Sequence, residues 1–155
     1  MSFSIETPSE IRGVLIPLQQ QTLLLPNSAV TEIIDYRELD PVDGAPAWLA
    51  GSTDWHHRRL LVVQFERLLG QAEVAASQRR RIMVCYTLNE AAKQPFVGIL
   101  AMAIPRLVRV TPEQLQGQAL EPELADAPVS AALLFDGQPV LIPDLDGLEA
   151  RLSQA

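Results

Sequence analysis

The sequence predicts a mainly β protein built from two small β-barrels with a few short helices. Short apolar runs recur along the chain between proline, glycine and polar residues, a pattern typical of short strands. The stretches LLVVQFERLLG (60–70) and PVLIPDLDGLEARL (139–152) also resemble each other, because each reads as a strand followed by a short amphipathic helix. This similarity predicts two related halves within one domain (1–155), at about 11–70 and 80–143, and a final helix at about 144–152.

The first half is predicted to contain two hairpins with a strand between them, after a loose arm at 1–10. The opening hairpin, RGVLIPLQQQTLLLP, turns at Gln19 and Gln20, and Pro17 places its first strand at a sheet edge or ends it early. The β-branched residues of AVTEIIDY favour a strand. WLAGSTDW and LLVVQF form the second hairpin with a turn near 56–58, and FERLLG is a short helix closed by Gly70.

The second half follows a small, polar linker at 71–79. Strands are predicted in RRIMVCYTL, PFVGILAMAI and PRLVRV, with a turn at NEAAKQ, and Thr111 and Pro112 suit the start of a helix. Asp136 and Gly137 between two apolar runs predict a type I′ hairpin, and Asp144 can cap the last helix. Alternation within the two clearest hairpins predicts six inward side chains: Leu60, Val62, Leu133, Phe135, Val140 and Ile142.

Composition restricts the classes of function. The 155 residues carry a formal net charge of -7, which disfavours nucleic acids and anionic membranes as partners. Arginines nevertheless cluster at 58–59 and 79–81, so a local basic patch remains open. We expect a cytoplasmic protein without direct membrane insertion, because we see no signal peptide, no apolar run long enough for a membrane span and a single cysteine, Cys85.

No residue pattern predicts catalysis, a cofactor or a metal site. The glycines are scattered and form no phosphate-binding loop, and Cys85 lies in an apolar strand without a neighbouring base. His56 and His57 are adjacent, so in a strand they would point to opposite faces and would not chelate one ion. The carboxylates Asp54, Glu66 and Asp144 are expected to serve as caps and solvated surface.

The candidate binding residues lie around the second hairpin turn. Two tryptophans bracket a polar turn that carries histidine and arginine; the residues are Trp48, Trp55, His56, His57, Arg58 and Arg59. Aromatic residues and arginine dominate the hot spots of protein interfaces. Two interpretations of the tryptophans stay open: they pack in the core, or they are exposed anchors for a protein partner.

Residues 51–65 of this hairpin resemble the signature G-x-x-N-L-R-G-x-x-[VI]-P-[VI]-x-[DN]-L of the CheW-like family of bacterial chemosensory adaptors. The resemblance extends to the lead-in VDGAPAWLAG, to AVTEII and to VLIPDLDGLEARL, and so over most of the chain. The departures include Asp54 for asparagine, Trp55 for leucine, His56 for arginine, His57 for glycine and Leu61 for proline. Glycine tolerates positive φ in such a turn, whereas histidine does so only at some strain.

A narrower resemblance concerns the branch of type IV pilus chemosensory systems called ChpC. The stretches DW, FE and AIPRLVRV together look like that branch. The resemblance implies two five-stranded, SH3-like barrels packed about a shared core. It further implies a non-catalytic adaptor, without cofactor, between a chemoreceptor's cytoplasmic tip and the regulatory domain of a CheA-type histidine kinase. A small barrel enzyme or ligand-binding protein, and a nucleic-acid-binding barrel, remain the alternatives.

Overall fold

The computed structural model describes residues 11–71, 79–87 and 95–154. The predicted arm at 1–10, most of the linker at 71–79 and the turn at NEAAKQ lie outside these residues. Within them, no helix is long and apolar enough to cross a membrane.

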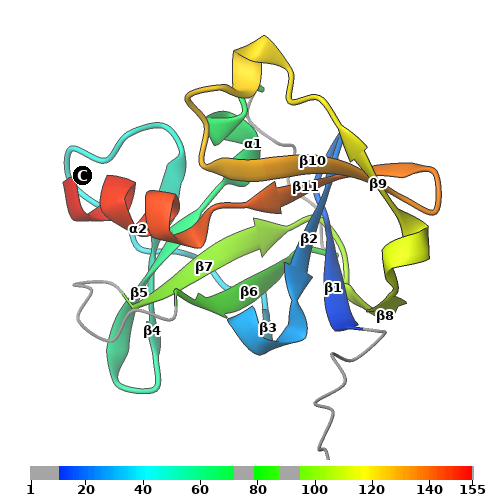
Figure 1. Ribbon diagram of the computed structural model, residues 1–155. Helices are drawn as coiled ribbons and strands as arrows, with labels where there is room; N and C mark the ends of the chain where they lie inside the picture. Colours follow the sequence, from blue (N-terminus) through cyan, green and yellow to red (C-terminus); the bar gives the residue numbers. More distant parts are fainter. Residues whose placement is uncertain (1–10, 72–78, 88–94, 155) are drawn as a thin grey trace, which may run out of the picture.

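Two antiparallel-rich sheets make up the molecule, which confirms the prediction of a mainly β fold (Figure 1). The six-stranded sheet has the order β8 (Arg106–Val110), β1 (Ile11–Pro17), β2 (Thr22–Pro26), β11 (Gln138–Pro143), β10 (Val129–Phe135) and β9 (Leu115–Gln118). The five-stranded sheet has the order β3 (Val30–Asp35), β6 (Arg81–Tyr86), β7 (Phe96–Ala101), β5 (Arg58–Val63) and β4 (Leu49–Trp55). The α-helices are short: α1 (Phe65–Leu68) and α2 (Leu145–Gln154).

Both sheets share one plan, in which two hairpins are joined by their second strands in parallel. In the six-stranded sheet, hairpins β1–β2 and β10–β11 meet where Leu23 of β2 lies opposite Leu141 of β11. In the five-stranded sheet, hairpins β4–β5 and β6–β7 meet through the parallel pair β5–β7. This repeated plan accounts for the similarity between 60–70 and 139–152, since β5 and β11 occupy equivalent places.

The sheets do not follow the expected division at 11–70 and 80–143. The first and last hairpins along the chain build the six-stranded sheet, and the two middle hairpins build the five-stranded sheet. The six-stranded sheet also includes β8 and β9 at its edges. It therefore has one strand more than the five expected for each barrel. Parallel strands cannot be joined by a tight turn, so the second strand of each hairpin pairs with a strand that a longer connection separates from it.

Three apolar clusters fill the structure. One lies inside the five-stranded sheet around Leu60, Val62 and Ile82, and a second inside the six-stranded sheet around Leu15, Phe135 and Val140. The largest lies between the sheets and includes the opposite faces of the same strands, so that β5 is buried on both sides. Leu148 and Leu152 of α2 are buried in this shared core, which holds the final helix against the strands (Figure 1).

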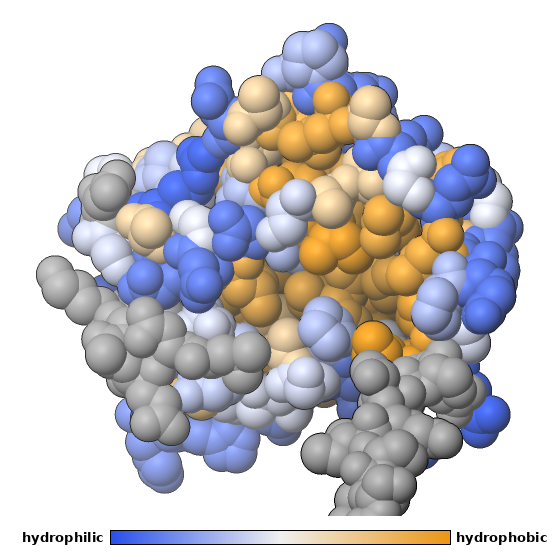
Figure 2. Space-filling model, in the orientation of Figure 1, coloured by the Kyte–Doolittle hydropathy of each residue, from blue (hydrophilic) through white to orange (hydrophobic). Residues whose placement is uncertain are grey.

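Most of the predicted inward residues are buried. Leu60, Val62, Phe135 and Val140 are at most 8% exposed, while Leu133 and Ile142 are only partly buried at the margin of the second cluster. That cluster is open on one side, and Figure 2 shows apolar residues gathered on this face over β2, β10 and β11. The incomplete burial of two positions therefore reflects the open margin of the sheet.

Local signals predicted several turns and caps. Asp136 and Gly137 have φ values of 48° and 81°, as a type I′ turn requires. The Oδ1 of Asp144 accepts a 3.1 Å hydrogen bond from the Gly147 backbone N–H at the start of α2. At Thr111, however, the expected helix is only a single 3₁₀ turn, Pro112–Gln114.

Candidate functional site

The candidate site is the hairpin β4–β5, whose turn consists of His56 and His57 alone. Trp55 pairs with Arg58 across the turn, and the two histidines have φ values of 46° and 63°. Both central residues therefore take the left-handed conformation of a type I′ turn, which glycine or asparagine usually occupies. His57, in the place of the family's glycine, thus has the positive φ for which strain is expected in a histidine, and His56 shares the same conformation.

The hairpin belongs to an edge of the five-stranded sheet that is tied to the opposite edge strand. A backbone bridge joins Asp40, which follows β3, to Ser52 of β4, with hydrogen bonds of 2.8 and 2.9 Å. Gly51 makes this approach possible, because a Cβ at that position would lie 2.7 Å from the Asp40 carbonyl oxygen. The first glycine of the signature thus permits the sheet to curl and close on itself.

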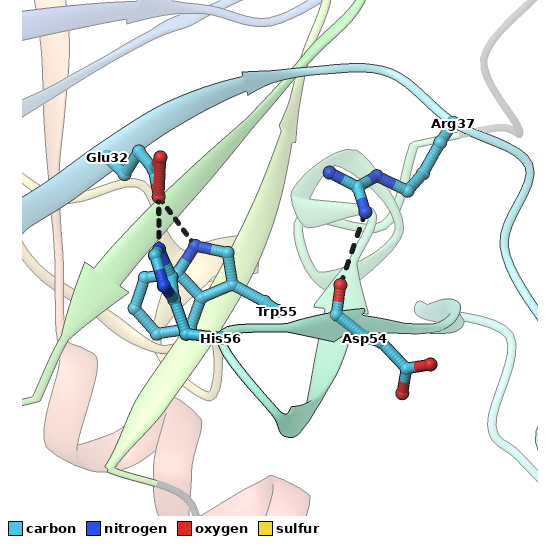
Figure 3. Close-up of polar contacts among 5 residues, drawn as sticks. All are labelled: Glu32, Arg37, Asp54, Trp55 and His56. Atoms are coloured by element: carbon cyan, nitrogen blue, oxygen red, sulfur yellow. Dashed lines mark hydrogen bonds and ion pairs between the residues drawn. The ribbon is translucent and has the colours of Figure 1, made fainter.

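Trp55 is a core residue. Its side chain is 8% exposed and belongs to the cluster inside the five-stranded sheet, where its ring centroid lies 5.0 Å from that of Phe96. Its indole Nε1 donates a 2.7 Å hydrogen bond to Oε2 of Glu32 on β3 (Figure 3). The packing interpretation therefore holds for Trp55, whose buried side chain anchors the end of β4 next to the turn.

Glu32 is a site residue that sequence reasoning missed. Its Oε2 also lies 3.2 Å from His56 Nε2, so one carboxylate oxygen contacts both residues at the end of β4 (Figure 3). The hydrogen bond from Trp55, and next that from His56, lower the pKa of the Glu32 carboxyl. The alternation of side chains along β3 could have identified it, because Glu32 lies two residues before the inward-facing Ile34 and so shares its face of the strand.

Beyond Trp55 the turn is polar and open to solvent. His56, His57, Arg58 and Arg59 are all exposed, and the His56 side chain retains 67% of its accessible surface. The Arg58 guanidinium lies 5.0 Å from the centroid of the Phe96 ring, a cation–π distance. Arg59 lies opposite Asp54 in the ladder. Arg58 and Arg59 are consecutive on β5, so their side chains leave opposite faces of the strand. We call the four exposed residues together the hairpin surface.

Trp48 lies apart from the hairpin surface. It precedes the other end of β4, about 23 Å along an extended strand from Trp55. Its side chain is half-buried against the shared core between the sheets, whereas Trp55 packs in the cluster of the five-stranded sheet. The structure thus brings five of the six candidate residues together, with Trp55 below and four residues above, and leaves Trp48 elsewhere.

The remaining ionisable and nucleophilic side chains form no second candidate site in the described residues. Within 11–71, 79–87 and 95–154, no three His, Cys, Asp or Glu side chains gather where they could hold a metal ion. Complete burial raises the pKa of the Cys85 thiol to about 12, so this cysteine is no nucleophile at neutral pH. Among the described residues that line a cavity of about 200 Å³ beside β2, β9 and β11, only Glu121 is ionisable.

Comparisons with known proteins agree with this architecture. No curated protein matches the sequence. Among solved structures, the fold is similar to the scaffolding protein TtCheW from Thermoanaerobacter tengcongensis, with a TM-score of 0.72 and 14% identity over 86% of this chain and 88% of that one. The profile of the CheW-like domain matches residues 12–152, which include every strand of both sheets except the first residue of β1. The chain therefore belongs to the CheW-like domain family.

Proposed function

We propose that this protein is a non-catalytic adaptor of chemosensory signalling. It would link the cytoplasmic tip of a chemoreceptor to the regulatory domain of a CheA-type histidine kinase, within the cytoplasm and without a cofactor. The observation that carries the proposal is the family match across residues 12–152. CheW-like scaffolding proteins are non-catalytic, and the similar structure TtCheW is itself a scaffolding protein.

The hairpin surface is the proposed contact for one of these partners. It presents two histidines in a two-residue turn and two arginines at the start of β5, next to a buried tryptophan whose hydrogen bond to Glu32 holds the end of β4. Rigid placement reduces the conformational entropy lost on binding, and arginine is enriched in interface hot spots. Trp48 would add to the same partner's contact only if that partner also covers the far end of β4.

We further propose that the signalling system is one that controls type IV pili and twitching motility. The support is the resemblance of DW, FE and AIPRLVRV to the ChpC branch. The replacement of the family's arginine by His56 supports a binding partner that differs from those of other family members. Arginine offers a permanent, forked charge, whereas histidine near neutral pH is largely uncharged.

A bridging experiment tests the adaptor role. Receptor cytoplasmic fragments from the pilus system, attached to vesicles, are sedimented with the kinase regulatory domain in the presence and absence of this protein. An adaptor increases the amount of kinase domain in the pellet, and vesicles without receptor fragment serve as the control. If the protein does not sediment with the receptor vesicles and leaves the kinase domain in solution, the adaptor proposal fails and a small ligand-binding barrel becomes the better interpretation.

A further inference from the structure

A pair of arginines lies directly opposed on the six-stranded sheet, far from the hairpin surface. Arg12 of β1 is in register with Arg109 of β8, so the two exposed side chains share one face. Like charges directly opposite one another destabilise an antiparallel pair. Neither guanidinium forms an ion pair or side-chain hydrogen bond in the part of the chain that the structure describes. The arrangement therefore lowers stability without an internal compensation.

The same face carries the most exposed large apolar side chain described. Leu107 is 73% exposed, although Val14, its partner across the ladder, is 1% exposed in the shared core. The shared core thus ends at Val14, and the sheet continues uncovered to Leu107. A groove of about 260 Å³ runs there between β8 and the 3₁₀ turn after β2, lined by Arg12, Asn27, Leu107, Val108 and Arg109.

The strand β8 also offers a free edge. It pairs with β1 on one side, and no described strand pairs with its other side (Figure 1). An unpaired edge presents backbone N–H and C=O groups that can accept an additional extended segment. Charge, apolar surface and backbone edge therefore meet within one short strand.

We propose that this groove binds an extended, acidic segment of a protein partner. A carboxylate between Arg12 and Arg109 would remove their repulsion and form charge-assisted hydrogen bonds. An apolar side chain beside it would cover Leu107, and the part of the segment that extends beyond the groove would pair with the free edge of β8, on the side away from β1. The sign of the local charge opposes the net charge of -7, so the pair selects an acidic group locally while the whole molecule repels long polyanions such as nucleic acid.

The experiment begins with a displayed library of random peptides. Peptides are selected on the wild-type protein and counter-selected on the double variant Arg12→Ala/Arg109→Ala. We expect enriched sequences with Asp or Glu next to an apolar residue. In titrations of one such synthetic peptide, the double variant should bind about tenfold more weakly or worse, and added salt should weaken wild-type binding. Leu107→Ser should also weaken it.

A matched control and two competitors make the test decisive. Arg58→Ala/Arg59→Ala removes a basic pair from the other sheet and should leave peptide affinity unchanged. Equal affinity of the Arg12/Arg109 variant, enrichment of peptides without acidic residues, or equal competition by inorganic phosphate or a single-stranded oligonucleotide would overturn the proposal. The Arg12/Arg109 variant should melt at or above the wild-type temperature. A clear decrease would also overturn it, since the pair would then be structural.

Discussion

The indole Nε1 of Trp55 donates a 2.7 Å hydrogen bond to Oε2 of Glu32, and this contact joins the two edge strands of the five-stranded sheet. Trp55 ends β4 and Glu32 lies in β3, so the bond holds the sheet closed immediately below the hairpin surface. The Asp40–Ser52 bridge closes the same pair of edges further along. The position of the exposed turn therefore depends on a partly buried polar contact.

The Trp55–Glu32 contact can be measured by a double-mutant cycle. Trp55→Phe keeps an aromatic ring but removes the N–H donor, and Glu32→Gln removes the charge of the acceptor. Each single variant should unfold at lower denaturant than wild type, and the double variant should lose less than the sum of the two. Trp48→Phe, at the other end of β4, is the control and should show no coupling to Glu32→Gln. Strict additivity at Trp55 would contradict the contact.

The pH dependence of stability gives a second test of Glu32. Hydrogen bonds from Trp55 and His56 lower the pKa of this carboxyl in the folded state, so the ionised form is favoured by folding. Its contribution to the free energy of unfolding is then present above the unfolded pKa and is lost as the pH falls through the folded pKa. In acid titrations followed by denaturant unfolding, Glu32→Gln should show a shallower loss than wild type. Parallel curves would contradict the assignment.

Glu66 should behave in the opposite sense. It is 1% exposed at the start of α1, its Oε1 has no hydrogen-bond partner among the described residues, and burial raises the pKa of its carboxyl. Its favourable contribution is complete below the unfolded pKa and is lost as the pH rises through the folded pKa. We expect Glu66→Gln to raise the melting temperature at neutral pH and to leave it nearly unchanged in acid. Asp146→Asn, on the exposed first turn of α2, is the control; a lower neutral melting temperature for Glu66→Gln would refute the prediction.

The strain in the His56–His57 turn can be relieved by one substitution. His57→Gly removes a Cβ from a residue with φ of 63° and should raise the free energy of unfolding by about 1 kcal/mol. The equivalent turn supplies the matched control: Gly137→His, at φ of 81° and with no atom within 4 Å of the place a Cβ would take, should lose a similar amount. Denaturant unfolding measures both. A loss of stability in His57→Gly would show that the histidine side chain stabilises the turn.

The burial of Val62 and Ile142 predicts which of two substitutions by aspartate destabilises the fold more. From alternation alone, Val62→Asp and Ile142→Asp should both abolish folded protein. The structure separates them, because Val62 is fully buried while Ile142 is only partly buried at an open margin. We expect no soluble folded protein for Val62→Asp and a folded but less stable Ile142→Asp. Normal melting of Val62→Asp would show that the register of β5 is wrong.

The sequence predicted local features more fully than long-range ones. The pair Asp136–Gly137 specifies its turn by itself, since both residues tolerate positive φ. Asp144 caps the helix that begins at Leu145, because its side chain accepts a hydrogen bond from the Gly147 N–H. The parallel contacts of β2 with β11 and of β5 with β7 join residues far apart in sequence, and no local pattern encodes them. The sequence alone does not determine the role of Trp55 for the same reason: its partner, Glu32, lies on another strand.

The hairpin surface is the central claim, and one titration tests it most directly. Wild-type protein and Arg58→Ala/Arg59→Ala are titrated against the receptor cytoplasmic fragment and against the kinase regulatory domain, with Gln116→Ala on the exposed β9 as the control. Trp55 is kept, because its replacement by alanine would remove about 3–5 kcal/mol of core packing and confuse binding with folding. We predict that the double variant melts normally and loses about 2 kcal/mol or more of binding free energy for one partner. Unchanged affinity for both partners would contradict the claim and leave the turn a solvated loop.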